Sequence, residues 1–326
     1  MATEFIVTGG AGFIGSNLVA TLNARGHEHI LIVDRLDHDG KKKNLDGLKF
    51  HDCLDKDDFR KQFLGNNLQH VDTVFHMGAC SSTTETDEEY LTDNNFRYTR
   101  ELCAWCLDHD VRFIYASSAA TYGNGSLGYS DEDKVTPSLR PLNLYGKSKQ
   151  MFDLWALENK VLDRIAGLKY FNVYGPHEDH KGDMRSVVNK ACQQILTTGA
   201  TRLFRSCKPE YKDGEQDRDF VYVQDAVKIT LFFHDHPEVS GLFNCGTGQA
   251  RTWIDLIKAV FAAMERKPRI TFIDMPAEIQ ANYQYHTQAD ISKLLRTGYA
   301  GQFTPLEAGI HDYVRGYLLP NMLKKE

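Results

Sequence analysis

The chain has 326 residues, of which 42% are hydrophobic and 25% are charged, and its formal net charge is -6. This composition is typical of a globular protein with a full core in one large or two modest domains. The acidic balance gives no electrostatic support to nucleic-acid binding, and no apolar run approaches the roughly 18 residues that a membrane span needs. We therefore expect neither a nucleic-acid nor a membrane partner.

The cysteine pattern indicates a reducing compartment. The seven cysteines are scattered and odd in number, which fits reduced thiols better than a disulfide framework. The first predicted strand begins almost at Met1, which leaves no room for a signal peptide. We expect a cytoplasmic protein. Cys103 and Cys106 form a C-x-x-C motif inside a predicted helix, where positions i and i+3 share a face, so we interpret both as core residues.

Short apolar runs alternate with helical patterns over the first half of the chain. They predict a strand over 4–8, a helix over 13–25, strands over 30–33 and 73–76, a helix over 97–109, a strand over 112–116, a helix over 143–162 and a strand over 165–171. This alternation predicts an α/β fold with a Rossmann-type, doubly wound parallel sheet. Ligands are then expected at the carboxyl ends of the strands.

The alternation breaks after Phe171. The remaining elements are predicted as a polar loop over 174–183, a helix over 185–198, a strand over 219–223, a helix over 225–234, a strand over 242–245, a helix over 253–264, a strand over 269–273 and a helix over 305–319. We interpret residues 1–171 and 219–247 as the Rossmann domain. Residues 172–218 and 248–326 are interpreted as a smaller mixed α/β lobe for the substrate.

A glycine-rich segment follows the first predicted strand. Gly9 permits a tight turn, Gly12 lets the backbone approach a pyrophosphate, and Gly15 lets helix and strand pack closely. The following helix N-terminus supplies free N–H groups and a partial positive charge. These features predict a dinucleotide site.

The end of the second predicted strand bears on which dinucleotide binds. Asp34 lies where an acidic residue meets the adenosine ribose, which favours NAD. Arg35 follows directly, with Lys41 nearby, and an arginine fork suits a 2′-phosphate. We expect NADP, with NAD as the alternative.

Proton-transfer chemistry is predicted from two further segments. Tyr145 and Lys149 are four residues apart on one helix, so the phenol and the ammonium can meet, and a nearby cation lowers the pKa of a tyrosine. Ser117 and Ser118 end a predicted strand, and a hydroxyl there can hold a substrate alcohol near Tyr145. We assign this role to Ser118.

The glycine segment, Ser118 and Tyr145-x-x-x-Lys149, in this order, resemble the extended short-chain dehydrogenase/reductase family. That resemblance implies nucleotide-sugar substrates and a role for Lys149 at the nicotinamide ribose. The 4,6-dehydratases of the family carry an Asp-Glu pair after the strand-end hydroxyl, where this chain has Ala119-Ala120. Since alanine cannot transfer a proton, elimination of water is disfavoured.

A more specific resemblance spans nearly the whole chain. Residues 77–84, 93–95, 116–123, 170–176 and 180–182, and Tyr283 ahead of 287–290, are similar to the ADP-L-glycero-D-manno-heptose 6-epimerases. In that family, NADP takes a hydride from C6 of the heptose and returns it to the opposite face, for lipopolysaccharide core biosynthesis. The resemblance implies that Tyr145 serves one orientation of the sugar and Lys181 the other. It also implies a pentamer.

The resemblance carries individual contacts to this chain. NADP is expected at Gly9, Gly12, Phe13, Ile14, Gly15, Asp34, Arg35, Lys41, Lys56, Met77, Gly78, Ala79, Cys80, Ser81, Asn94, Lys149, Val173 and Lys181. The ADP-sugar is expected at Asn172, Asp183, Lys190, Phe204, Arg205, Ser206, Arg218 and Tyr283. Arg218 is chemically apt, because a guanidinium binds diphosphate oxygens with two hydrogen bonds.

Two departures from the family concern these contacts. Arg35 stands where some members have asparagine, and the stretch 207–217 is longer than in some members, which affects the register of the contacts from 204 to 218. His177 and His180 flank two acidic residues, but hydride transfer needs no metal and none is expected.

Three other functions stay open at this point. A UDP-hexose 4-epimerase using NAD would share Ser118, Tyr145 and Lys149 but would have no use for Lys181. A nucleotide-sugar ketoreductase would consume NADPH. A catalytically silent NADP sensor would need no proton-transfer residues.

Overall fold

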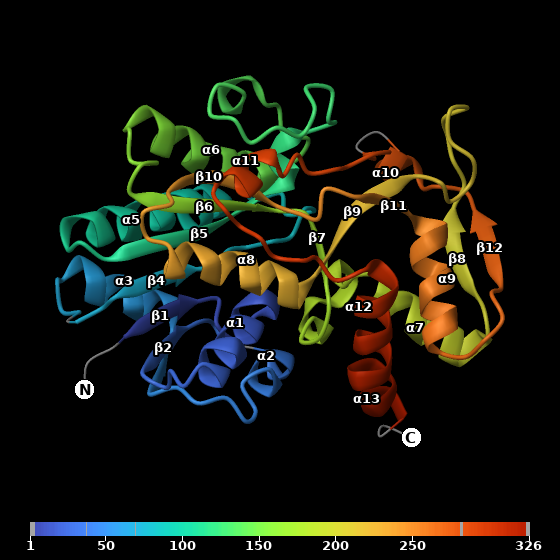
Figure 1. The fold of residues 1–326 in the computed structure, drawn as a ribbon, viewed down its shortest axis with the longest axis horizontal. Coiled ribbons are helices and arrows are strands. Elements are labelled where there is room, and N and C mark those ends of the chain that lie inside the picture. Colours follow the sequence, from blue (N-terminus) through green and yellow to red (C-terminus); the bar gives the residue numbers. More distant parts are fainter. Residues whose placement is uncertain (1–3, 37, 69, 281–282, 324–326) are drawn as a thin grey trace.

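The structure is a computed structural model that describes residues 4–36, 38–68, 70–280 and 283–323. A seven-stranded sheet in the order β10-β6-β5-β4-β1-β2-β3 forms its centre, and each strand is parallel to its neighbours. Figure 1 shows helices on both faces of this sheet. The predicted doubly wound, Rossmann-type α/β fold is confirmed.

The central sheet is built mainly from the first 171 residues. Its strands are β1 (Phe5–Thr8), β2 (Ile30–Val33), β3 (Asp52–Leu54), β4 (Thr73–His76), β5 (Arg112–Ser118), β6 (Ile165–Tyr170) and β10 (Gly241–Cys245). The accompanying helices are α1 (Phe13–Ala24), α2 (Asp39–Lys43), α3 (Lys56–Leu64), α4 (Glu88–Leu91), α5 (Tyr98–Asp108), α6 (Leu144–Glu158) and α8 (Val223–Asp235). Short 3-10 turns are η2 (Ala119–Tyr122) and η3 (Thr136–Ser138).

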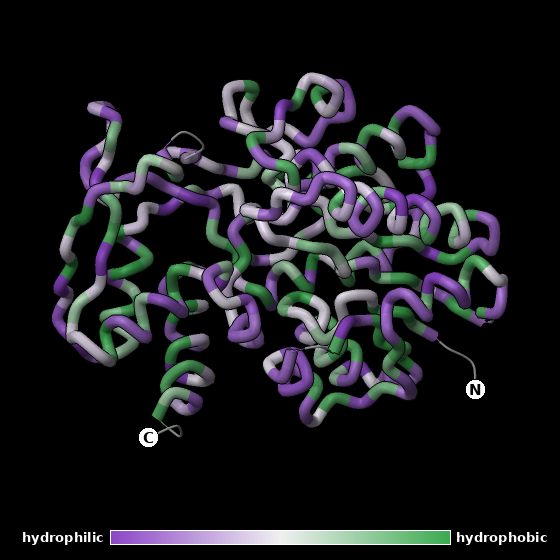
Figure 2. Tube along the Cα trace, turned by 180° about the vertical axis from the view of Figure 1, so that it is seen from behind, coloured by the Kyte–Doolittle hydropathy of each residue, from purple (hydrophilic) through white to green (hydrophobic). Residues whose placement is uncertain are grey.

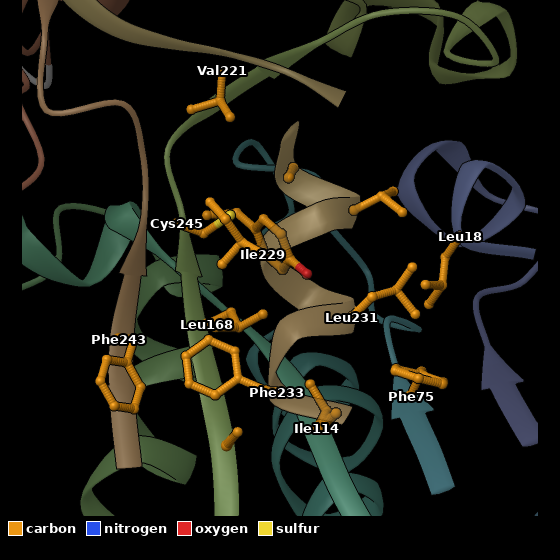
Figure 3. Close-up of a cluster of buried hydrophobic side chains, with 14 of the residues drawn as sticks. Leu18, Phe75, Ile114, Leu168, Val221, Ile229, Leu231, Phe233, Phe243 and Cys245 are labelled. Carbon is orange, nitrogen blue, oxygen red and sulfur yellow. The ribbon is translucent and has the colours of Figure 1, made fainter. Parts of the chain in front are cut away.

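The core explains why these strands lie at the centre. Every residue of β1, β2, β4 and β6 is buried, as expected for parallel strands that are covered on both faces. Figure 3 shows Ile229 and Phe233 of α8 packed against Leu168 of β6 and Ile114 of β5. In Figure 2 the hydrophobic colour concentrates on the inner strands and the hydrophilic colour on the outer loops.

The topology creates a ligand crevice between β1 and β4. The chain runs from β1 to β2 and β3 on one side and returns to place β4 on the other. The loops after β1 and β4 meet so closely that a Cβ at Gly9 would lie 2.8 Å from the Cα of Gly78. Doubly wound sheets bind ligands at such a switch point.

The second region forms two small sheets beside the central one. One has the order β11-β9-β7, from β7 (Asn172–Tyr174), β9 (Asp217–Tyr222) and β11 (Ala250–Thr252); the other pairs β8 (Thr201–Phe204) with β12 (Ile270–Ile273). The helical elements here are η4 (Asp179–Met184), α7 (Val187–Thr198), α9 (Trp253–Ala263), α10 (Ala277–Gln280), α11 (Ser292–Arg296), α12 (Leu306–Tyr313) and α13 (Leu319–Leu323). Figure 1 shows most of them as a smaller lobe at one side of the central sheet.

The lobe boundaries predicted from the sequence stay a prediction. The predicted boundary between residues 218 and 219 passes through β9, which pairs in the small sheet, whereas α8 and β10 pack in the central part. The lobe has a core of its own, centred on Leu256, Val260 and Ile310.

Two helices contain π-helical turns that the sequence pattern does not predict. The turn η1 (Thr92–Arg97) joins α4 to α5, and η5 (Val314–Leu318) joins α12 to α13. Such turns insert one extra residue and frequently mark functional sites. Cys103 and Cys106 are buried in α5, in agreement with their interpretation as core residues. Within the described ranges, no helix is long and apolar enough to cross a membrane.

The central core should dominate stability. Leu168 is fully buried in β6, so Leu168→Ala should lower the free energy of unfolding by about 2–5 kcal/mol. Leu64 is 61% exposed, so Leu64→Ala should change it by no more than about 0.5 kcal/mol. Urea unfolding of both variants measures this difference, and equal losses would contradict the assignment of the core.

Candidate active site

A cavity of about 730 Å³ opens at the carboxyl ends of the central strands. All predicted cofactor-binding residues and the predicted catalytic residues Ser118, Tyr145 and Lys181 line it. Asn172 lines it as well, but the other predicted substrate residues do not. One cavity therefore brings together the glycine loop after β1, the end of β5, the start of α6 and the segment after β7.

The glycine loop forms a cradle that only glycine permits. Gly9 has φ +65° and the Gly12 N–H donates to its carbonyl at 2.9 Å. A Cβ at Gly15 would lie 2.1 Å from the carbonyl oxygen of Gly9. Helix α1 starts after Gly12 without a side-chain cap, so its first N–H groups face the cavity end of the loop. These features fit the pyrophosphate of a dinucleotide.

Basic groups surround the acid at the end of β2. The Asp34 carboxylate accepts hydrogen bonds from the backbone N–H groups of Ala11 at 3.0 Å and Arg35 at 2.7 Å. Lys41 forms an ion pair with it at 2.8 Å. Burial, with further influence from Lys41, lowers the pKa of His180 to about 4. The carboxylate is thus engaged within the protein, and Arg35 and Lys41 present positive charge at this end of the cavity.

Ser118, Tyr145 and Lys149 meet where β5 ends and α6 begins. Asn143 caps α6 through its side chain, which accepts from the Gly146 N–H at 2.8 Å. The Ser118 hydroxyl accepts from Ala120 N–H at 3.1 Å and hydrogen-bonds the Tyr145 phenol. Lys149 is 5% exposed, and its ammonium donates to the Ala116 carbonyl at 2.8 Å.

The structure corrects the expectation for the tyrosine pKa. Burial raises the pKa of Tyr145, and the Ser118 hydrogen bond only partly opposes this. The ammonium of Lys149 bonds a backbone carbonyl, and burial lowers the pKa of Lys149 to about 8. The predicted depression of the Tyr145 pKa by Lys149 is therefore wrong for this arrangement, because both groups are desolvated.

The π-helical turn η1 supports the same region. The Asn95 side chain bonds both backbone groups of Cys80 at 2.9 Å and the Ser148 hydroxyl at 3.0 Å. It joins the loop after β4 to helix α6, while its neighbour Asn94 lines the cavity. Sequence reasoning identified Asn94 but missed the structural role of Asn95, since a π-helical turn leaves no regular spacing to detect.

Lys181 faces the cavity from the loop after β7. Its ammonium lies 5.2 Å from the centre of the Phe13 ring, and burial lowers the pKa of Lys181. The loop is anchored by the buried Glu178, which accepts from Ser186 N–H at 2.6 Å and from the Tyr313 hydroxyl at 2.9 Å. Lys181 is thus a partly buried cation on an element separate from the one that carries Tyr145.

The predicted substrate residues lie at different places. Arg218 is buried between the rings of Trp253 and Tyr283, at 5.5 and 5.2 Å from their centres. Trp253 lines the cavity, and its indole N–H donates to the Tyr283 hydroxyl at 3.0 Å. The predicted substrate residues Arg218 and Tyr283 therefore contact a cavity-lining residue without lining the cavity themselves. Trp253 was missed because a tryptophan at a helix start reads as a core residue.

The remaining predicted substrate residues lie away from the cavity lining. Arg205 forms an ion pair with Asp274 at 3.0 Å, and Ser206 donates its backbone N–H to Asp213. Phe204 ends β8, Lys190 lies on α7, and Asp183 is exposed within η4. None of these lines the cavity, and their assignment stays a prediction.

The cavity is also lined by residues that the sequence analysis did not assign to the site. His76 is 2% exposed at the end of β4, and burial lowers its pKa to about 3, so it is neutral between the hydroxyls of Thr8 and Thr99. Ser117, Tyr90 and Phe220 also line the cavity. Among the described residues no group of three or more His, Cys, Asp or Glu side chains could hold a metal ion.

Comparisons with known proteins agree with this geometry. The NAD dependent epimerase/dehydratase family matches residues 5–246. An ADP-L-glycero-D-manno-heptose-6-epimerase of Nitratidesulfovibrio vulgaris is 54% identical, over 96% of this chain and 98% of its own length. The crystal structure of the Helicobacter pylori enzyme of that name superposes with a TM-score of 0.80 at 28% identity, covering 97% of this chain and 96% of its own. A Thermus thermophilus UDP-glucose 4-epimerase in complex with NAD has a TM-score of 0.75 at 26% identity, covering 96% of this chain and 99% of its own.

The Lys149 amine should titrate well below other lysines. In the nucleotide-free protein labelled with ¹³C-lysine, its resonance, assigned through Lys149→Arg, should have a midpoint near pH 8 (a pKa of about 8). Above that pH the folded protein has released a proton that the unfolded chain still binds. The contribution of Lys149 to stability, measured as the difference in unfolding free energy between wild type and Lys149→Met, should therefore rise from about pH 8 to the ordinary lysine pKa of about 10.4. A midpoint at the ordinary lysine value would contradict the burial.

Proposed function

The chain belongs to the NAD dependent epimerase/dehydratase family, and from this premise we propose that it is an ADP-L-glycero-D-manno-heptose 6-epimerase. The observation that carries the proposal is the joint placement of Ser118, Tyr145 and Lys181 in the cavity that holds the glycine loop. The 54% identity over nearly the full length of both chains supports the same substrate. The sequence-based prediction of a heptose 6-epimerase agrees with these relatives.

Inversion at C6 needs two proton-transfer groups. Gly9, Gly12 and Lys149 line the part of the cavity that would hold a nicotinamide dinucleotide, which would supply a reversible hydride acceptor for C6. Tyr145, hydrogen-bonded to Ser118, takes the proton of the C6 hydroxyl as the carbinol becomes a ketone. After the ketone has turned, the hydride arrives on the other face and a second group must protonate the oxygen. We assign this role to Lys181, which lines the same cavity and whose pKa is lowered by burial.

We propose NADP as the cofactor. The family and the NAD complex of a structural neighbour support a nicotinamide dinucleotide, and the adenosine end of the cavity bears on which one. Asp34 is already bound by Lys41 and two backbone N–H groups, whereas an NAD-binding acid must accept from a ribose hydroxyl. Arg35 and Lys41 offer cations for a 2′-phosphate.

A UDP-hexose 4-epimerase is the main alternative. The observation behind it is the fold match to the Thermus thermophilus UDP-glucose 4-epimerase, which is 26% identical. The heptose epimerase relative is 54% identical, so the alternative is disfavoured. Assembly into a homo-oligomer, a pentamer by family resemblance, and a cytoplasmic location are further proposals, which light scattering and cell fractionation can test.

Activity on the heptose tests the function directly. The purified protein should invert C6 of ADP-D-glycero-D-manno-heptose without added cofactor, as followed by NMR. Tyr145→Phe and Lys181→Met should each lower kcat by about 100-fold or more, since general acid–base groups contribute about 10²–10⁴. Lys147→Met is the matched control, because Lys147 is exposed on the same helix as Tyr145 and pairs with Glu88. Inversion of UDP-glucose in place of the heptose would overturn the proposal.

Cofactor selection should depend on Arg35. Arg35→Ala should weaken NADP binding about tenfold or more, since a hydrogen bond to a charged group contributes about 1.5–3 kcal/mol. NAD binding should change little. Lys42→Ala is the control, because Lys42 lies on the same short helix as Lys41 but faces Asp39. Isothermal titration of nucleotide-free protein measures both affinities, and an equal loss for NAD and NADP would contradict the 2′-phosphate contact.

A further inference from the structure

We propose that the buried pair Asp153–Lys169 positions the proton-transfer residues Tyr145 and Lys149 and balances the charge beneath them. The inference rests on the roles given to Tyr145 and Lys149 in the proposed function. It names two residues that the sequence analysis did not single out. Asp153 is on helix α6, and Lys169 is on the neighbouring strand β6.

The contacts between β5 and α6 follow one register. Residues 145, 149 and 153 are four apart and share one face of the helix. Three consecutive residues at the end of β5 bind them. Ala116 accepts from Lys149 at 2.8 Å, Ser117 donates to Asp153 at 2.7 Å, and Ser118 bonds the phenol of Tyr145. Asp153 is therefore the third point of the same attachment that holds the two proton-transfer residues.

The carboxylate of Asp153 is completely enclosed. Its side chain and that of Lys169 have no exposed area, and their charged atoms are 2.7 Å apart. The Tyr115 hydroxyl donates to the other carboxylate oxygen at 2.9 Å, and Lys169 also donates to the Thr121 hydroxyl at 2.7 Å. Both charges are thus paired and hydrogen-bonded.

Stability alone does not account for such a pair. Desolvating two charges is so unfavourable that well-packed apolar residues at the same positions are often as stable or more stable. Lys169 moreover lies in β6, where every residue is buried and the other strand positions of the sheet carry mostly apolar side chains. A role in positioning Tyr145 and Lys149 would explain why a charged lysine occupies this buried position.

Electrostatics links the pair to the reaction. The titratable groups facing Lys149 and Tyr145 are His76 from β4, Cys80 from the loop after β4 and Asp153 from α6, while Tyr115 and Lys169 face Asp153 from β5 and β6. Burial has the largest influence on both groups, raising the pKa of Tyr145 and lowering that of Lys149, and the Asp153 carboxylate adds an upward influence on each. Because the Lys169 ammonium lies 2.7 Å from this carboxylate, we expect its positive charge to offset that influence. Removal of Lys169 should then raise the pKa of Tyr145, and removal of Asp153 should lower it.

The titration of Tyr145 tests this without any substrate. The holoenzyme with its bound nucleotide is labelled with ¹³Cζ-tyrosine, and the Tyr145 resonance is assigned through Tyr145→Phe. Lys169→Met leaves an unbalanced anion, and the midpoint should rise by about one pH unit or more. Asp153→Asn removes the carboxylate that raises the pKa of Tyr145, and the midpoint should fall by a similar amount. In the double variant it should return toward the wild-type value.

Two controls separate charge from structure. Tyr115→Phe removes a hydrogen bond to the same carboxylate without changing charge, and Lys169→Arg keeps the charge; neither should move the midpoint beyond a few tenths of a pH unit. The pH dependence of kcat should shift in the same directions as the resonance, with little change in KM. If Lys169→Met does not fold, Asp153→Asn carries the test, because asparagine keeps the shape of the side chain.

Each outcome decides the matter. Opposite shifts in the two single variants support the positioning pair. Unmoved midpoints, or shifts in one direction, in folded variants overturn it and leave a purely structural ion pair. A wild-type protein that fails to invert C6 refutes the proposed function instead, because the tyrosine titration is read in the absence of sugar.

Discussion

Buried polar contacts fix helix α6 against the end of strand β5, next to the apolar packing of Phe152 on Tyr115, and the active site depends on that attachment. The last three residues of β5 each bind one residue of the helix, and these helix residues, at positions 145, 149 and 153, are spaced four apart. Because these contacts are buried and paired, a small shift of the helix would leave unsatisfied polar groups, at about 1–3 kcal/mol each. The phenol and amine therefore have one stable register relative to the strand end, where the parallel sheet presents its ligands.

The cavity is lined on one side by the β5–α6 contact and on another by the segment that carries Lys181, which has its own anchors. Lys181 reaches it from a loop that Glu178 ties to Ser186 and to Tyr313 near the C-terminus. The two π-helical turns lie beside these two supports, η1 at Asn95 and η5 directly after Tyr313. Tyr145 and Lys181, the proposed proton-transfer groups, therefore lie on independent elements. This arrangement suits a reaction in which a ketone is reduced from the face opposite to the one that was oxidised.

Much of the fold and of the cofactor site could be predicted from the sequence, because both depend on local patterns. Buried parallel strands are short apolar runs, and Gly9, Gly12 and Gly15 answer to steric needs that only glycine meets. Tyr145 and Lys149 are recognisable by their spacing. The strands β3, β7, β8 and β11 were not predicted, since each has only three or four residues, too few to show a periodicity.

The rest of the site depends on contacts between distant segments. The pKa of Tyr145 follows from burial, which the spacing of two residues does not report, so the predicted direction was wrong. Lys169 reads as an isolated charge in an apolar strand until Asp153 is seen beside it. The substrate contacts predicted between residues 204 and 218 lie on both sides of a long loop, and family similarity alone does not fix their alignment. Arg218 does not line the cavity itself but packs against Trp253, which does.

The central claim is that one hydride leaves C6 and returns to the same carbon from the opposite face. Substrate carrying deuterium at C6 tests it most directly, with the label followed by NMR and mass spectrometry during inversion in ordinary water. The account predicts that the inverted product keeps the deuterium at C6. Loss of the label to solvent as C6 inverts would contradict it and would indicate removal of the hydrogen as a proton.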